Sequence, residues 1–416
     1  MEKEKIIKKW VLLLSLLTAF PPMSTDMYLP AIPSLVQKWQ QPLSIINLTL
    51  VCFFLTYSGF LLIYGPLSDR FGRRRPLMVG IAVYVLSSLL CALSTNAGSL
   101  IAFRMLQGAG SASASALSMA VCKDVFDDRQ REKVLAYIAV IMSLAPMLAP
   151  VIGGWILTVL SWQWIFIMLG IMGTIALFGV YLMPETLQAL EKPIPLRPLS
   201  NYVRLLHNRR YIGLTLVMSL SFIPLFAFIA SSSDIYITGF GLSERHFGYF
   251  FGFNALALMA GSFACVRLTR LVSSHSIITA GFAGVLVGGL WLLLSGRQGP
   301  WDLALPMFVI SFSSGMSRPP SNNLVLQQVD RDAGTASSLL IFTTMMSGAA
   351  AMWFISLNWH EKIHVLGAMG VASGALVLSL WLLMRRFLLV RRLSSFESRL
   401  QSPDLSTIGD GTRNIS

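Results

Sequence analysis

The chain has few charged residues. Only 12% of its 416 residues are Asp, Glu, Lys or Arg, whereas 55% are hydrophobic. A typical soluble protein carries about 25% charged residues. So small a share of charge excludes a water-soluble globular protein, because such a chain cannot cover its surface with polar groups.

Cysteine and histidine are also scarce. The four cysteines (Cys52, Cys91, Cys122 and Cys265) lie far apart, and the five histidines do not cluster. This spacing excludes a disulfide framework and a metal site. The sequence also lacks the motifs H-E-x-x-H, G-x-S-x-G and the Walker loop, which disfavours an enzyme and ATP-driven pumping. We therefore expect no cofactor and no metal.

Long apolar runs are abundant. A run of about 20 apolar residues is long enough to cross a bilayer as a helix, which satisfies every backbone polar group internally. The runs are 10–33, 45–67, 77–94, 99–122, 134–160, 162–183, 211–235, 246–266, 276–295, 302–324, 334–357 and 363–384. They predict an all-α polytopic membrane protein with twelve transmembrane helices, the first of them uncleaved.

The net charge of +13 follows the predicted membrane topology. If the N-terminus is inside, 26 of the 32 Lys and Arg residues lie on the inner side, four lie outside and two lie within spans. This asymmetry is what the positive-inside rule requires. It predicts cytoplasmic termini, and it explains the basic balance without nucleic acid.

A polar segment divides the apolar runs into two sets of six. We predict two pseudo-symmetric six-helix bundles, a cytoplasmic linker between them and a cytoplasmic tail. The predicted boundaries are 1–184, 185–210, 211–385 and 386–416.

The connection between the second and third spans concentrates charge in the sequence GPLSDRFGRRRP. Membrane orientation alone requires its arginines, but not its acid or its glycines. The stretch resembles the signature loop of the major facilitator superfamily, G-x-L-x-D-R-x-G-R-R/K-R/K. That resemblance implies a conformational latch made by Gly65, Asp69, Arg70, Gly72 and Arg73.

The fifth span contains APMLAPVIGG. Its residues Ala145, Ala149 and Gly153 lie at i, i+4 and i+8, so they form one stripe for close helix contact. An ordinary packing stripe would look the same. The stretch also resembles the helix-five motif of drug-exporting antiporters in that superfamily, which includes Pro150 and Gly154, although alanine replaces glycine at 145 and 149.

Two ionisable residues lie well inside the first and fourth spans. Ser15, Thr18, Pro22 and Asp26 share one face of the first helix, and Arg104 lies at a similar depth in the fourth. Ionisable residues at membrane depth are costly and usually functional. We expect Asp26 to carry an exchanged proton and Arg104 to tune it, although a fixed structural pair is the alternative.

The stretches STDMYLPAIP, FGLSERHFGYFFGFN and AGTASSL resemble the bicyclomycin/chloramphenicol-resistance (Bcr/CflA) drug:proton antiporters. The geometry of the superfamily implies a central substrate cavity. Its expected residues are Tyr57, Phe222, Phe226, Asn254 and Arg318. For each aromatic residue the alternative is ordinary packing. Arg318 departs from the family pattern, and its alternative is a side chain that reaches the membrane surface.

The resemblance implies a proton-coupled antiporter that exports drugs or other small, largely lipophilic compounds across the bacterial inner membrane. The alternative is a proton-coupled exporter of one specific metabolite, such as an amino acid or sugar, or an importer of it, which the helix-five stretch disfavours. The expected partners are a small-molecule substrate, protons as the coupling ion and membrane lipid. We expect a monomer.

Overall fold

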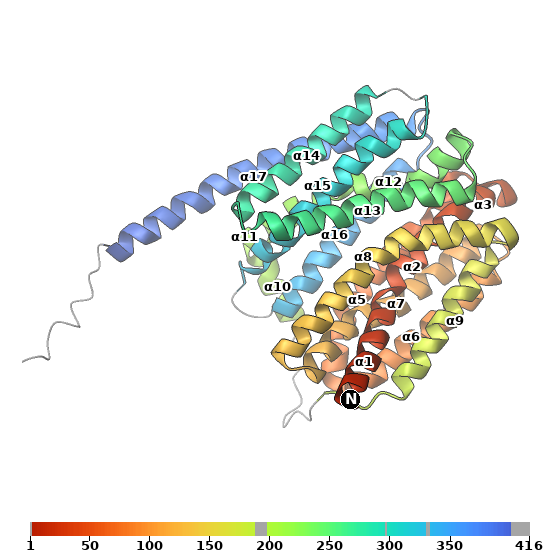
Figure 1. Cartoon of the computed structure of the whole chain (residues 1–416), viewed down its shortest axis with the longest axis horizontal. Helices are drawn as coiled ribbons and strands as arrows, with labels where there is room; N and C mark the ends of the chain where they lie inside the picture. The colour runs from red at the N-terminus through yellow and green to blue at the C-terminus, as the bar shows by residue number, and fades with distance from the viewer. Residues whose placement is uncertain (1, 188–197, 296–297, 330–332, 401–416) are drawn as a thin grey trace, which may run out of the picture.

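The computed structural model describes residues 2–187, 198–295, 298–329 and 333–400, and these segments are helical with short connections. Figure 1 shows two groups of helices that pack side by side. The predicted all-helical fold is confirmed.

Prolines divide the first span of the N-terminal half. Pro21 and Pro22 lie at the start of the short helix 20–26, Pro30 at the start of the 3-10 helix 29–31 and Pro33 at the start of the helix 32–39. Proline lacks the N–H that a continuous helix requires, so the span is divided at these positions. The helices of this half are α1 (Glu2–Thr18), α2 (Phe20–Asp26), η1 (Leu29–Ala31), α3 (Ile32–Trp39), α4 (Leu43–Ile46), α5 (Leu48–Phe71), α6 (Arg74–Ala92), α7 (Ala97–Val125), α8 (Asp128–Val159) and α9 (Gln163–Tyr181).

The seventh span is broken in the same way, just before Pro224, so Phe222 lies in the break. The helices from the linker onward are α10 (Pro198–His207), α11 (Arg209–Leu220), α12 (Ile223–Ser233), the π-helix η2 (Asp234–Gly239), α13 (Glu244–Leu268), α14 (Ser274–Leu294), α15 (Trp301–Leu326), α16 (Ala333–Ile355) and α17 (Lys362–Leu400).

Within the described residues, nine helices are long and apolar enough to cross a membrane by length and composition. The other three predicted spans are too short or too polar to meet these criteria of length and composition. The first is divided, and its apolar helix is only Lys9–Thr18. The fourth, α7, is rich in Gly, Ala and Ser, and the tenth, α15, contains Arg318 and three prolines.

The two halves repeat the same helix pairs. In the first half α7 packs on α5 and α6, and α6 packs on α9; in the second half α15 packs on α13 and α14, and α14 packs on α17. Small residues lie at equivalent contacts: Gly80 of α6 faces Ser113 of α7, and Gly284 of α14 faces Ser313 of α15. This repeat is far clearer in the contacts than in the residues of the equivalent loops.

The halves meet along two helix pairs, α8 with α13 and α5 with α16. Figure 1 shows α8 and α13 side by side at the centre of the molecule. We call the end of the bundle that holds Arg73 the basic end, and the end that holds Asn47 the opposite end.

The linker and the tail extend this bundle. Tyr202 of α10 donates a hydrogen bond of 3.2 Å to the carbonyl of Leu62 in α5, so the linker helix contacts the N-terminal half. Residues 188–197 of the predicted linker and 401–416 of the predicted tail lie outside the described residues. The last helix, α17, continues past Arg385 to Leu400 without a break and projects beyond the bundle (Figure 1).

Candidate functional site

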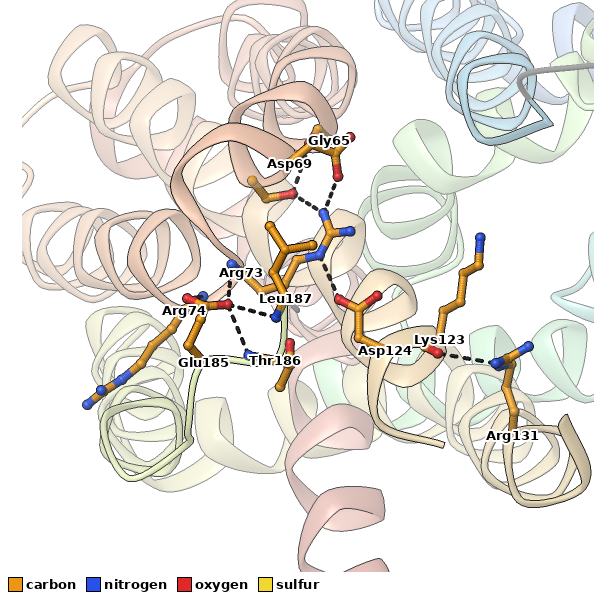
Figure 2. Close-up of polar contacts among 11 residues, drawn as sticks. Gly65, Asp69, Arg73, Arg74, Lys123, Asp124, Arg131, Glu185, Thr186 and Leu187 are labelled. Carbon is orange, nitrogen blue, oxygen red and sulfur yellow. Dashed lines mark hydrogen bonds and ion pairs between the residues drawn. The ribbon is translucent and has the colours of Figure 1, made fainter. Parts of the chain in front are cut away.

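The charge cluster at the basic end is organised around Arg73 (Figure 2). Its guanidinium donates to Asp69 Oδ1 at 2.5 Å, to Ser68 Oγ at 2.6 Å and to Asp124 Oδ2 at 2.8 Å. Burial opposes the charge of Arg73, but the carboxylates of Asp124 and Asp69 outweigh that effect and raise its pKa above the usual value. The arginine therefore ties the end of α5 to the end of α7.

Glu185 holds the turn between α5 and α6. Its carboxylate accepts the backbone N–H of Arg73 at 2.8 Å and that of Arg74 at 3.2 Å, and also those of Thr186 and Leu187. Burial alone would raise the pKa of Glu185, but these four N–H groups outweigh it and lower the pKa. The segment after α9 is thereby attached to the signature loop (Figure 2).

The two glycines of the loop differ in what they do. Gly72 has φ 84°, a left-handed conformation that favours glycine, and a Cβ there would collide with the carboxylate of Glu185. A Cβ on Gly65 would meet nothing within 4 Å, so no close contact in this conformation requires glycine there. The Gly65 carbonyl accepts a hydrogen bond from Ser68 at 2.8 Å.

The remaining members of the predicted latch are less enclosed. Arg70 is exposed, with its guanidinium 5.3 Å from the ring centre of Phe71, and 45% of the Asp69 side chain is exposed. Asp69 accepts its hydrogen bond from Arg73 of the same loop. The latch stays a prediction.

Sequence reasoning missed Asp124 and Glu185 as partners of the loop. Each had a weak signal, because an acid directly follows the apolar part of the fourth span and another follows the sixth. Their side chains meet the loop only through the fold, which the spacing along the chain does not reveal.

The small residues of α8 make contacts with two different neighbours. Gly153 faces the first span, where an added Cβ would collide with the carbonyl of Met27, and Ala149 is fully buried. Gly154 faces the other half, where an added Cβ would lie 2.5 Å from the carbonyl of Glu244. Of the two glycines only Gly153 belongs to the predicted stripe, and Gly154 lies on a different face of α8.

A third contact continues the junction between the halves. An added Cβ on Gly248 of α13 would lie 2.8 Å from the carbonyl of Pro150. Proline at this position also leaves a backbone carbonyl of α8 without its helical partner. The backbones of α8 and α13 are therefore packed directly on each other toward the opposite end of the bundle.

Asn47 joins the halves at the same end. Its Nδ2 donates to the carbonyl of Ala230 in α12 at 2.8 Å and to Ser356 Oγ, after α16, at 2.7 Å. Asn47 is completely buried and Ser356 is 1% exposed. The opposite end of the bundle is closed in this conformation.

Arg104 lies in a sealed polar site in the N-terminal half. Its Nη1 donates to the Ser24 carbonyl at 2.9 Å and to Gln107 Oε1 at 2.6 Å. Its guanidinium carbon lies 4.4 Å from the ring centre of Phe53 and 5.3 Å from that of Tyr28. Hydrogen bonds and cation–π contacts thus compensate a completely buried charge.

Asp26 is also buried, with only 5% of its surface exposed. Its carboxylate accepts a hydrogen bond from Thr25 Oγ1 at 2.9 Å. Both Asp26 and Arg104 are described, and no ion pair joins them. Arg104 instead holds the backbone at Ser24, two residues before the acid, so any influence on Asp26 passes through the helix. The proton-coupling role of both residues stays a prediction.

Three of the five predicted cavity residues come together. The guanidinium of Arg318 lies 5.5 Å from the ring centre of Phe222 and is within electrostatic range of Tyr57. Phe226 packs edge-on against Phe54 of α5 at 5.7 Å. Asn254 is buried and donates to the Phe250 carbonyl at 3.2 Å, and no hydrogen bond links it to the other four, all of which the structure describes.

Within the part of the chain that the structure describes, no three His, Cys, Asp or Glu side chains lie close enough together to hold a metal ion.

Comparison with known proteins places the chain in a family. The profile of the Major Facilitator Superfamily matches residues 14–352. The chain is 30% identical over 396 residues to the bicyclomycin resistance protein homolog of Haemophilus influenzae, covering 93% of this chain and 98% of that protein. It is 28% identical over 344 residues to the multidrug transporter MdfA of Escherichia coli O6:H1, covering 79% of this chain and 83% of MdfA.

A solved structure shares the fold. The D-xylose–proton symporter superimposes with a TM-score of 0.74 at 16% identity, covering 89% of this chain and 97% of the symporter. At that identity the likeness shows the fold alone. The profile match, the two relatives and the shared fold agree. This chain belongs to the major facilitator superfamily and is a multi-pass membrane transporter.

Proposed function

We propose that the protein is a proton-coupled antiporter that exports drugs or other small, largely lipophilic compounds across the bacterial inner membrane. Relatives named for bicyclomycin resistance and multidrug transport support the class of substrate. The basic end is cytoplasmic in this proposal, as are both termini. The protein acts as a monomer in contact with membrane lipid and needs no cofactor besides the proton.

One observation carries the proposal: the buried acid Asp26 lies directly beside a backbone contact of the helix that joins the two halves. Asp26 is followed by Met27, whose carbonyl packs against Gly153 of α8. The next residue, Gly154, packs against the other half at Glu244. Asp26 is therefore attached to the helix that meets the other half, and we expect separation of α8 from α13 to bring water closer to the acid.

This coupling explains how a proton could drive export. A charged carboxylate at membrane depth is costly unless it is paired or hydrated, whereas the protonated form is neutral. In this closed arrangement Asp26 is buried, and no cationic side chain among the described residues forms an ion pair with it. Opening of the opposite end would hydrate the acid and change its affinity for a proton, so the proton would be exchanged as the two halves rock.

The cluster at the basic end would control the other gate. Arg73 is held by carboxylates from α5 and α7, and Glu185 attaches the turn to the end of α9. These contacts keep the cytoplasmic ends of the N-terminal half in one rigid unit. We propose that this unit docks against the C-terminal half when the cytoplasmic side closes.

The test is transport in vesicles that contain only the purified protein. Rhodamine 6G, a lipophilic cation, serves as the first probe, and a panel of drugs and metabolites selected by growth of an efflux-deficient strain follows. We expect accumulation that requires an imposed pH gradient and stops when an ionophore collapses it. Equal accumulation with and without the gradient would contradict proton coupling, and accumulation of a single metabolite alone would contradict drug export.

A further inference from the structure

Arg318 is a charge without a charged partner. Among the described residues, no carboxylate lies within ion-pair distance of it and no side chain or carbonyl accepts a hydrogen bond from it. The five N–H donors of its guanidinium are therefore available to a ligand. The side chain is exposed, unlike Asp26 and Arg104, which are both buried.

The position of Arg318 argues against a side chain that simply reaches the cytoplasmic surface. Helix α15 continues for eight residues to Leu326, which corresponds to about 12 Å along the axis and exceeds the length of an arginine side chain. The guanidinium also lies over the ring of Phe222, which comes from the break between α11 and α12. That contact directs it toward the seventh span.

Both halves of the protein contribute to its surroundings. Phe222 and Arg318 belong to the C-terminal half, whereas Tyr57 belongs to α5 of the N-terminal half and lies within electrostatic range of Arg318. An exposed guanidinium between helices of both halves lies where a transported compound would pass. At this place the exposed guanidinium offers a positive charge, and it is flanked by Phe222 and Tyr57, which are 8% and 7% exposed.

We propose that Arg318, Phe222 and Tyr57 form a binding subsite for compounds that combine a planar apolar body with an anionic group such as a carboxylate, sulfonate or phosphate. The guanidinium fork can bind two oxygens of one anion, and Phe222 supplies a face for the ring system. This inference rests on the proposed transport function. The same charge disfavours lipophilic cations at the subsite.

The test compares two dyes that share a ring system and differ in charge. Fluorescein is negatively charged near neutral pH, and rhodamine 6G is positively charged. Binding of each to the purified protein in detergent is measured by fluorescence anisotropy. The variants are Arg318→Gln, which removes the charge, Arg318→Lys, which keeps it, and Arg267→Gln, which removes an exposed charge at the end of α13.

We expect Arg318→Gln to weaken fluorescein binding by about tenfold. Rhodamine 6G binding should stay unchanged or become tighter in that variant, because a repulsive charge is gone. Arg318→Lys should keep most of the fluorescein affinity, and Arg267→Gln should match the unmodified protein. Each variant is first checked for an unchanged size-exclusion profile.

Three results would overturn the subsite. They are no fluorescein binding to the unmodified protein, equal loss of both dyes in Arg318→Gln, and equal fluorescein loss in Arg267→Gln. Gradient-driven export of rhodamine 6G would still stand in each case, so the proposed function would survive. Absence of gradient-driven transport for every probe would instead contradict the proposed function.

Discussion

Gly154 allows a direct test of how the two halves close. In the variant Gly154→Ala the new Cβ would lie 2.5 Å from the Glu244 carbonyl oxygen and 3.1 Å from the Cα of Arg245. Carbon and oxygen atoms in ordinary contact lie about 3.5 Å apart, so α8 and α13 would have to separate by about 1 Å. Overpacking of this kind typically costs about 1–3 kcal/mol.

The cost falls on one conformation only. Glu244 belongs to the other half, so the collision exists only while α8 and α13 are in contact at the opposite end. A cost of about 1–3 kcal/mol corresponds to a population change of about 5-fold to 150-fold toward the arrangement in which that end is open. Gly153→Ala differs, because Met27 lies in the same half and the collision persists in both arrangements.

The assay uses a cysteine placed at Ser356, which is 1% exposed at the closed end. Cells that carry Ser356→Cys are treated with a membrane-impermeant maleimide, and labelling is compared with that of the unmodified chain. Gly154→Ala should speed labelling by at least about 5-fold and slow export. The matched control is Gly59→Ala, where an added Cβ meets nothing within 4 Å. Unchanged labelling and export in Gly154→Ala would refute the reasoning.

Three further predictions follow from the polar contacts. In the Ser356→Cys chain the hydroxyl that accepts one Asn47 hydrogen bond is already gone, so Asn47→Ala removes the remaining one, to the Ala230 carbonyl, and should speed labelling by about fivefold; labelling at the original rate would show that this bond does not hold the end closed. Asp69→Asn should impair export but not membrane insertion. Asp124→Asn should lower the melting temperature more than Asp69→Asn does, because the Asp124 side chain is 17% exposed and the Asp69 side chain is 45% exposed. The reverse order of melting temperatures would contradict the account of Arg73. The pKa of Glu185 is lowered from its ordinary 4.5, so its carboxylate stabilises the fold above pH 4.5 and ceases to do so as the pH falls through the lowered pKa. The melting temperature of the unmodified protein should therefore exceed that of Glu185→Gln at neutral pH, and the difference should disappear in acid. A difference that does not depend on pH would show that the charge is not the cause.

The sequence predicted the helices and the loop well, because both depend on local patterns. Apolar runs report membrane spans directly, and the spacing of Gly72 and Arg73 reports a turn with a charge cluster. The alanine and glycine spacing on α8 likewise indicated close packing. It could not show that Gly153 and Gly154 face two different helices, since the partners are distant in sequence.

The deep charges show where sequence reasoning stops. Asp26 and Arg104 were matched by depth along their helices, but depth does not specify the direction in which a side chain points. In the structure the Ser24 carbonyl, Gln107 and aromatic rings occupy the guanidinium of Arg104. Conversely, Arg318 and Phe222 come together because Pro224 breaks the seventh span, and no spacing rule links those positions.

The central claim is that Asp26 carries the exchanged proton, and substrate-induced proton release tests it most directly. Purified protein in weakly buffered detergent solution receives a substrate identified by the transport screen, and the released protons are followed with a pH indicator. The account predicts release from the unmodified protein and none from Asp26→Asn, whose amide cannot exchange a proton near neutral pH. Equal release from Asp26→Asn would place the proton site elsewhere and contradict the account.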